Sequence, residues 1–277
     1  ANPAEGPRHF IDLDRWYEND SCLLTGDYEL DRMMTGHWEW RTSDSVIVLK
    51  PQWVENSRMV FRTNEVHLSI DSFAIRQEMF GTYPDTPVMV SSFLYPDLDG
   101  ELYFVDSLKH HGIVPYYIER LYDRLVSEMK AGNQEVILRL CADMGHYISD
   151  AHVPLHTTSN YNGQYTGQIG IHAFWESRIP EMYELSHFNS LPGRAEYISD
   201  LREFIWEIVF KSYHLVEEVL SREKQARSMV PENKHYCYEE RGNNLVRTQC
   251  PELTEVYMKS MNGMVQDRWL SSIHAVG

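Results

Sequence analysis

The sequence has little of three things: cysteine, basic side chains and long apolar runs. Four cysteines in 277 residues are too few for a disulfide scaffold. Lysine and arginine number 25 against 41 aspartates and glutamates, a formal net charge of −16, which argues against a protein that holds long nucleic acid by its phosphates. No apolar run approaches the roughly 20 residues that span a bilayer, so we expect no transmembrane segment.

The same scarcities leave the cellular compartment open. The first residues, ANPAEGPRHF, have neither the basic nor the apolar region of a signal peptide, so an export signal was removed or never existed. Cys237 and Cys250 flank a polar, loop-like stretch and could form a disulfide in an oxidising compartment. Cys141 lies on a helical apolar face and is predicted to be a small core residue. Cysteine usage favours an exported protein only weakly.

What the chain does have is a strongly helical second half. From Ile113 to Met129 the apolar residues recur with the 3.6-residue period of one helix face, and Gly132 and Asn133 end the pattern. The same reasoning predicts helices over residues 113–129, 136–154, 171–185, 195–225 and 252–275. We expect these helices to form a single bundle, and the chain to be one mainly α domain over residues 1–277.

Residues 22–105 differ in texture. DSVIVLKP and SRMVFRTNEVHLSI carry β-branched residues with period-two alternation, which predicts one or two short hairpins. No repeat or flexible linker separates this stretch from the rest. We therefore expect an irregular, partly β insertion that packs on the bundle.

Ionisable residues gather where the pattern predicts buried helix, in HYISDAHVPLH at residues 146–156. His146 and Asp150 are four residues apart, so they project from one helix face, and His172 and Glu176 repeat that spacing. His156 follows a helix break at Pro154, which can fold its ring back towards the same place. One such pair alone is usually a surface ion pair, but two on apolar-flanked helices would cost several kcal/mol each to bury without a metal or a dense hydrogen-bond network.

The ligand types favour zinc among the metals. Imidazole and carboxylate at this spacing suit Zn²⁺ bound between helices. The alternative, a di-iron carboxylate bundle, uses Glu and His three residues apart and more Glu ligands than this sequence offers. The four-residue spacing and the excess of His over Glu favour zinc.

At these residues the sequence resembles a known family. HYISDAHVPLH followed by HAFWE resembles the S1/P1 nucleases and zinc-dependent phospholipases C, in the manner of bacterial members, and HFID at residues 9–12 matches a motif of the nuclease branch. The resemblance covers residues 106–277 and, briefly, residues 7–16. It implies a helical bundle of the phospholipase C/P1 nuclease type.

The resemblance implies two zinc ions held by two sets of three side chains. The ligands would be His9, His146 and Asp150 for the first ion, and His156, His172 and Glu176 for the second. Asp150 would also act as a bridging, catalytic carboxylate. Phe10 would stack on a nucleobase and Asp12 would hydrogen-bond its edge, although Phe10 could equally be a core aromatic.

The implied activity is hydrolysis of phosphodiester bonds in short, single-stranded nucleic acid or nucleotides, by a water that zinc activates. The alternatives are a phospholipase C-like hydrolase of phospholipid head groups, which Glu176 in place of Asp fits, and a zinc-binding structural or interaction module without full activity. HFID fits the nuclease branch. The resemblance and the cysteines together lead us to expect a secreted or periplasmic protein, and they leave the oligomeric state open.

The sequence departs from the family before His9, where only ANPAEGPR stands. Family members carry there a tryptophan and a histidine that help to bind a third zinc. A third ion is therefore expected only if other side chains supply its ligands. Asp14, Asp71 and Asp106 are the substitutes that the sequence offers.

Overall fold

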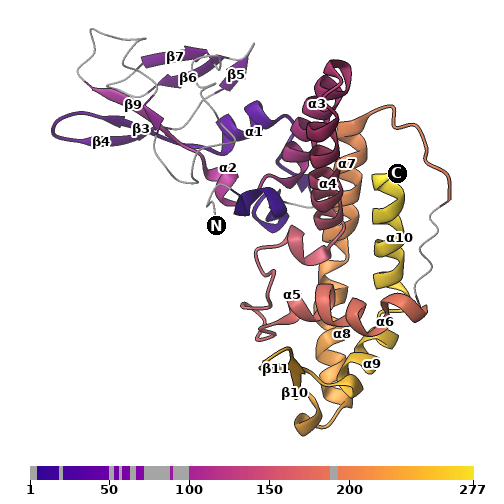
Figure 1. The fold of residues 1–277 in the computed structure, drawn as a ribbon. Helices are drawn as coiled ribbons and strands as arrows, with labels where there is room; N and C mark the ends of the chain where they lie inside the picture. The colour runs from indigo at the N-terminus through magenta and orange to yellow at the C-terminus, as the bar shows by residue number, and fades with distance from the viewer. Residues whose placement is uncertain are drawn as a thin grey trace. The chain divides into compact units, whose positions relative to one another are not determined.

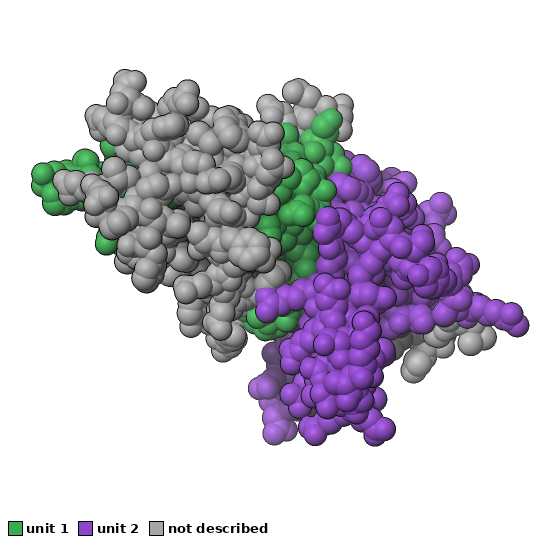
Figure 2. Space-filling view, turned by 90° about the horizontal axis from the view of Figure 1, so that it is seen from above, with its two compact units in different colours: residues 1–11, 15–117 green, residues 12–14, 118–277 purple. Residues whose placement is uncertain are grey.

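A computed structural model of the chain describes residues 5–18, 21–49, 53–55, 58–62, 67–71, 88–89, 100–187 and 193–277. The chain divides into two compact units (Figure 2). Unit 1 contains residues 1–11 and 15–117, and unit 2 contains residues 12–14 and 118–277. The described chain is mainly helical with antiparallel sheets, which confirms the predicted class.

Unit 1 combines short helices with antiparallel strands (Figure 1). Its four-stranded sheet has the order β4-β3-β9-β8, with strands Val46–Leu49, His37–Arg41, Glu101–Val105 and Val88–Met89. A three-stranded sheet consists of β5 (Trp53–Glu55), β6 (Arg58–Arg62) and β7 (His67–Asp71), and a third pair consists of β1 (Tyr17–Glu18) and β2 (Ser21–Cys22). The sequence predicted one or two hairpins, which is fewer strands than unit 1 contains. One reason is that β3 pairs with the distant β9, and no local pattern signals such a pairing.

A buried ion pair joins the two helices of unit 1, α1 (Tyr28–Thr35) and α2 (Ser107–His110). Arg32 Nε donates to Asp106 Oδ2 at 2.7 Å, and both side chains are almost fully buried. The other carboxylate oxygen of Asp106 accepts from the backbone N–H of Lys109 at the start of α2. Asp106 therefore serves the packing of unit 1, and its use as a substitute zinc ligand is not supported.

Unit 2 contains most of the helical residues (Figure 1). Its long helices are α3 (Val114–Ala131, whose first residues belong to unit 1), α4 (Gln134–Ala151), α7 (Leu201–His214), α8 (Val216–Met229), α9 (Pro251–Ser260) and α10 (Met264–Val276). Shorter helical segments are η4 (Pro154–Thr157), α5 (Ile171–Ala173), the π-helical turn η5 (Phe174–Arg178) and α6 (Ile179–His187). Helix α4 contacts both α7 and α10, and α8 contacts α9.

The core of unit 2 lies under the segments that carry the predicted ligands. Phe174 and Tyr257 pack ring against ring, with centroids 4.8 Å apart, and both are fully buried. Each such side chain stabilises the fold by about 1.5–3 kcal/mol. The buried apolar members of this core are Val153, Leu155, Ile171, Phe174, Trp175, Ile179, Val216, Val219, Leu220, Ala226, Val230, Leu253, Tyr257, Met261, Met264 and Val265.

Two of the predicted helices are each divided in two. The helix expected over residues 195–225 begins only at Leu201, where Asp200 caps it, and breaks at Leu215. The helix expected over residues 252–275 breaks at Asn262 and Gly263, which have φ angles of 49° and 88°. Left-handed residues stop an α-helix, and Asn and Gly adopt that conformation most readily. The apolar period continues across both breaks and conceals them.

The polar stretch between Cys237 and Cys250 forms a hairpin, whereas the sequence predicted a loop. Strands β10 (Tyr236–Arg241) and β11 (Asn244–Gln249) pair through a two-residue turn at Gly242 and Asn243. Gly242 has φ 60°, as tight hairpin turns require. The loop prediction was wrong because these strands are polar and mostly exposed, without an apolar alternation.

The cysteines divide into a bonded pair and two free thiols. Cys237 and Cys250 form a disulfide with their Cα atoms 5.0 Å apart, so the open pairing is resolved. Cys141 is exposed on α4, and the prediction that it is a core residue was wrong. The apolar face of α4 is covered beside Cys141 but not at it, since the neighbouring Leu140 is 2% exposed.

Among the described residues, no helix combines the length and apolarity needed to cross a membrane.

Candidate metal centre

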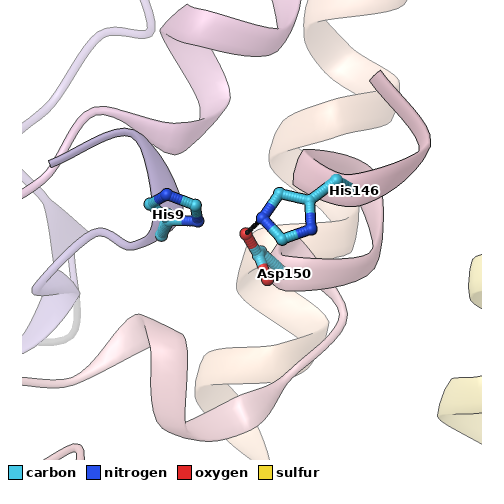
Figure 3. A group of neighbouring side chains, drawn as sticks. All are labelled: His9, His146 and Asp150. Carbon is cyan, nitrogen blue, oxygen red and sulfur yellow. Dashed lines mark ion pairs between the residues drawn. The ribbon is translucent and has the colours of Figure 1, made fainter. Parts of the chain in front are cut away.

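Helix α4 places the first pair of predicted ligands on one face, near its C-terminal end. His146 Nε2 lies 3.4 Å from Asp150 Oδ2, one helical turn further on (Figure 3). The side chain of His146 is 58% exposed, whereas that of Asp150 is only 7% exposed. The carboxylate thus lies at the base of the pair and the imidazole at the surface. Figure 3 also labels His9, which belongs to unit 1.

His156 joins this pair to the second one. Helix α4 ends at Ala151, and Pro154 begins the 3-10 turn η4 that turns His156 inwards. His156 Nδ1 lies 3.7 Å from Asp150 Oδ1, and its Nε2 lies 3.4 Å from Glu176 Oε2. Its side chain is only 10% exposed. The ring is therefore held between two carboxylates from different segments.

The second pair lies across the junction of α5 and the π-helical turn η5. His172 Nε2 is 2.9 Å from Glu176 Oε2. The neighbours Phe174 and Trp175 are buried in the core, which fixes the turn that carries the pair. The rings of His156 and His172 stack, with centroids 4.9 Å apart and planes inclined by 16°.

Two opposing effects act on the carboxyl of Glu176. Burial raises its pKa, and the hydrogen bonds and charges of His156 and His172 lower it. The histidines prevail, so the pKa of Glu176 is held well below its ordinary value. Glu176 is therefore a carboxylate at neutral pH, which is the form that binds a cation.

The residues of the second set fit a zinc ion. Ligand atoms of His156, His172 and Glu176 all lie within 4.8 Å of one another. Ligands at about 2.0–2.2 Å from one zinc are at most about 4.4 Å apart, and both histidine-to-Glu176 distances already satisfy this limit. Two imidazoles and one carboxylate are the donor types of catalytic zinc sites. The described chain therefore contains a group that could hold a metal ion.

A loop that the sequence did not single out for function borders His172. Tyr161 lies edge-on to the His172 ring, with centroids 5.9 Å apart and an interplanar angle of 85°. The loop is held by its own hydrogen bonds, among them Asn160 Oδ1 accepting from the N–H of Tyr165 at 2.8 Å. Gly163 has φ 71°, and a Cβ there would lie 2.5 Å from the carbonyl oxygen of Gln168. The loop has a rigid shape, and only the tertiary structure reveals that it contacts His172.

The N-terminal motif divides between the units. His9 ends the 3-10 turn η1 (Gly6–His9) in unit 1. Phe10 is half-buried in unit 1, with its ring against Gly112, which fits a packing role and leaves part of the ring accessible. Asp12 is half-buried and belongs, with Asp14, to unit 2.

Asp14 bonds the segment that follows His156. Its carboxylate accepts from the backbone N–H of Ser159 at 2.9 Å and from the hydroxyl of Ser159 at 2.5 Å. Its oxygens are therefore used in hydrogen bonds, which does not support Asp14 as a substitute ligand. The side chain of Asp71, the remaining substitute, lies outside the described residues.

His152 lies between the predicted ligands Asp150 and His156 in the sequence, but it makes different contacts. It is buried, at 2% exposure. Its Nδ1 donates to the carbonyl of Ile148 at 2.7 Å, and its Nε2 faces the hydroxyl of Ser271 at 3.2 Å. Burial and the charges of Arg268 and Lys211 lower the pKa of His152 to about 4, although the bond to Ile148 raises it, so the ring is neutral at neutral pH.

Comparison with protein-family models, with curated proteins and with solved structures finds no match for this chain.

Proposed function

We propose that the chain is a zinc-dependent phosphodiesterase that resembles the S1/P1 nucleases and acts on short, single-stranded nucleic acid or nucleotides. The observation that supports this proposal is the position of His156, with one ring nitrogen facing Asp150 and the other facing Glu176. That position joins two His/carboxylate pairs, spaced as in the family motifs, into one continuous group within unit 2.

In this proposal His156, His172 and Glu176 hold one zinc, and His146 and Asp150 contribute to another. Bound zinc would supply Lewis-acid charge to the phosphoryl oxygens and would lower the pKa of a coordinated water towards neutrality. The protein side chains fix the positions of the donors. Because Asp150 is buried beside His156, it is the carboxylate best placed to serve both sets of ligands.

His9 is proposed as the remaining ligand of the first set. Asp14 is held to Ser159, three residues after His156, so the chain that leads back to His9 starts beside the ligands. Asp14 lies five positions after His9, a span of at most about 18 Å. Phe10 and Asp12, which follow His9 in the sequence, are proposed as contacts of a nucleobase.

A second candidate function has one observation in its favour. The loop beside His172 exposes Tyr161, Tyr165 and Ile169 by 52%, 66% and 60%. Exposed apolar side chains around a zinc site suit an enzyme that works at a lipid surface. We therefore keep a phospholipase C-like activity on phospholipid head groups as the alternative, and a zinc-binding module without turnover as the third.

The disulfide between Cys237 and Cys250 supports export to an oxidising compartment, because such bonds persist there and are rare in the cytosol. We propose a secreted or periplasmic location on that ground.

The test measures zinc and hydrolysis together. Elemental analysis after dialysis should find at least two zinc ions per chain, and single-stranded DNA or RNA should be cleaved until a chelator is added. His172→Ala should lose metal and activity, whereas His214→Ala, which changes an exposed histidine at the end of α7, should keep both. Zinc without hydrolysis of oligonucleotides, nucleotides or phospholipid vesicles would favour the binding module. Hydrolysis of vesicles alone would favour the phospholipase.

A further inference from the structure

A cavity of about 280 Å³ lies in unit 2 between α4, η5 and α10. Its volume lies just below the range of about 300–1,000 Å³ that is typical of small-molecule sites. Much of the wall is apolar, with Val153, Trp175, Pro180, Val265, Trp269 and Ile273 among the lining residues. We call this space the α4–α10 cavity.

A buried guanidinium lines the α4–α10 cavity. Arg268 is 7% exposed, and it donates from Nε to the carbonyl of His152 at 2.9 Å. Its Nη2 donates to the carbonyl of Ile208 at 3.2 Å and to the hydroxyl of Ser212 at 2.5 Å. All these acceptors are neutral, and within the described ranges no carboxylate forms an ion pair with Arg268. Burial lowers the pKa of Arg268 to about 10, so it still carries its charge at neutral pH.

A buried cation without a counter-ion is costly, by several kcal/mol in proteins. The other ionisable groups of the wall do not supply that counter-ion. His152 has an imidazole, which carries no negative charge, and its two nitrogens face the carbonyl of Ile148 and the hydroxyl of Ser271. Glu176 also lines the cavity, but its Oε2 faces His156 and His172. The positive charge of Arg268 is thus available to a ligand.

The aromatic wall offers an unsatisfied hydrogen-bond donor. Trp175 is 5% exposed, and its Nε1–H is buried without a hydrogen-bond partner among the described residues. An unmade bond of this kind costs about 1–3 kcal/mol. A ligand that carries an anionic acceptor beside an apolar body would satisfy both Arg268 and Trp175, whereas a purely apolar ligand would satisfy neither.

We propose that the α4–α10 cavity binds a small organic anion, a carboxylate or a phosphate monoester on an aromatic or apolar body, whose charge pairs with Arg268 and whose body lies against Trp175 and Trp269. The proposal goes beyond the phosphodiesterase activity, because neither tryptophan nor Arg268 belongs to the predicted zinc ligands. If the cavity binds no anion, the proposed zinc site is not contradicted.

The test is calorimetric titration of the purified, full chain with benzoate and with phenyl phosphate, using benzyl alcohol as the uncharged control. At least one anion should bind with a dissociation constant of about 1 mM or tighter, and benzyl alcohol at least tenfold more weakly. Binding of benzoate alone assigns the site to carboxylates, and binding of phenyl phosphate alone assigns it to phosphate monoesters. Failure of both anions to bind at concentrations up to about 10 mM overturns the proposal.

Two variants locate the binding. Arg268→Met removes the charge and should weaken anion binding at least tenfold. Because this change can also destabilise α10, Ser272→Trp serves as the second variant, since Ser272 lines the cavity and a larger side chain there fills it while Arg268 stays. Arg222→Met, on an arginine of α8 that is 39% exposed, is the matched control and should bind like the parent. Anion binding that survives Ser272→Trp, or that a chelator alone abolishes, contradicts the proposal.

Discussion

His156 Nε2 lies 3.4 Å from Glu176 Oε2, although the two residues are twenty positions apart and belong to different helical segments. The other ring nitrogen of His156 faces Asp150. This histidine therefore joins the pair on α4 to the pair at η5. The proposed metal centre depends on that junction more than on any single ligand.

Replacing His156 should disrupt more than replacing His172. His156→Ala removes the ring that faces both carboxylates, so we expect the chain to lose more than one zinc, whereas His172→Ala should lose one. Both variants should also unfold at lower denaturant concentration, since metal binding is coupled to folding. Zinc per chain, by elemental analysis, and urea unfolding measure the two effects. Equal zinc loss in the two variants would contradict a joining role for His156.

Two ion pairs on α8 should differ greatly in their contribution to stability. Glu223 is fully buried and bonds both Arg227 and Gln168, whereas Glu218 and its partner Arg222 are about 40% exposed. Removing one member of a buried pair costs about 3–5 kcal/mol, and breaking an exposed pair costs about 0–1 kcal/mol. Glu223→Ala should therefore lower the free energy of unfolding by several kcal/mol more than Glu218→Ala in urea titrations. Similar losses of unfolding free energy in the two variants would show that burial does not determine how much each ion pair contributes.

Loss of the Asp14 contact should loosen the N-terminal motif without unfolding unit 2. Asp14→Ala removes the acceptor of the Ser159 N–H and hydroxyl, at a cost of about 1 kcal/mol. If His9 is a ligand, zinc bound by His146 and Asp150 should weaken while the other zinc remains, which zinc titration against a chelating dye can resolve. Asp44→Ala, at an exposed residue, should change nothing. Undiminished affinity for both ions would count against His9 as a ligand.

Reduction of the disulfide should destabilise the chain. Cys237 and Cys250 are thirteen positions apart, and closing a loop of this length stabilises a fold by about 3 kcal/mol in the chain-entropy account. Cys237→Ser should lower the free energy of unfolding by about 2–3 kcal/mol, and added reductant should then have no further effect. Cys141→Ser, at an exposed free thiol, should unfold like the parent. If the reductant lowers the free energy of unfolding of the parent no more than it lowers that of the Cys237→Ser variant, the disulfide is contradicted.

Salt should help the chain to act on longer nucleic acid. At a net charge of −16 the protein repels a polyanion, and salt screens that repulsion because the Debye length shortens to about 10 Å at 0.1 M. We expect kcat/KM for an oligonucleotide to rise about two- to tenfold between about 0.01 and 0.1 M salt, and that for a dinucleotide to change less than about twofold. A fall with salt for the oligonucleotide would indicate a basic binding track instead.

The sequence by itself determined most of the helices of the second half and the local pairing of the predicted ligands. The spacing of His146 from Asp150, and of His172 from Glu176, is local, and helix geometry converts it directly into neighbouring side chains. Apolar periodicity likewise located α3 and α4, because burial of one helix face leaves its mark on consecutive residues.

Only the tertiary structure decided what the local pattern does not encode. The breaks at Leu215 and Gly263, the β10–β11 hairpin and the exposure of Cys141 depend on which faces other segments cover. The approach of His156 to Glu176, the hold of Asp14 on Ser159 and the burial of Arg268 beside a cavity join residues from different elements. Such contacts follow from how helices pack, and packing is a property of the whole chain that no spacing within one helix can specify.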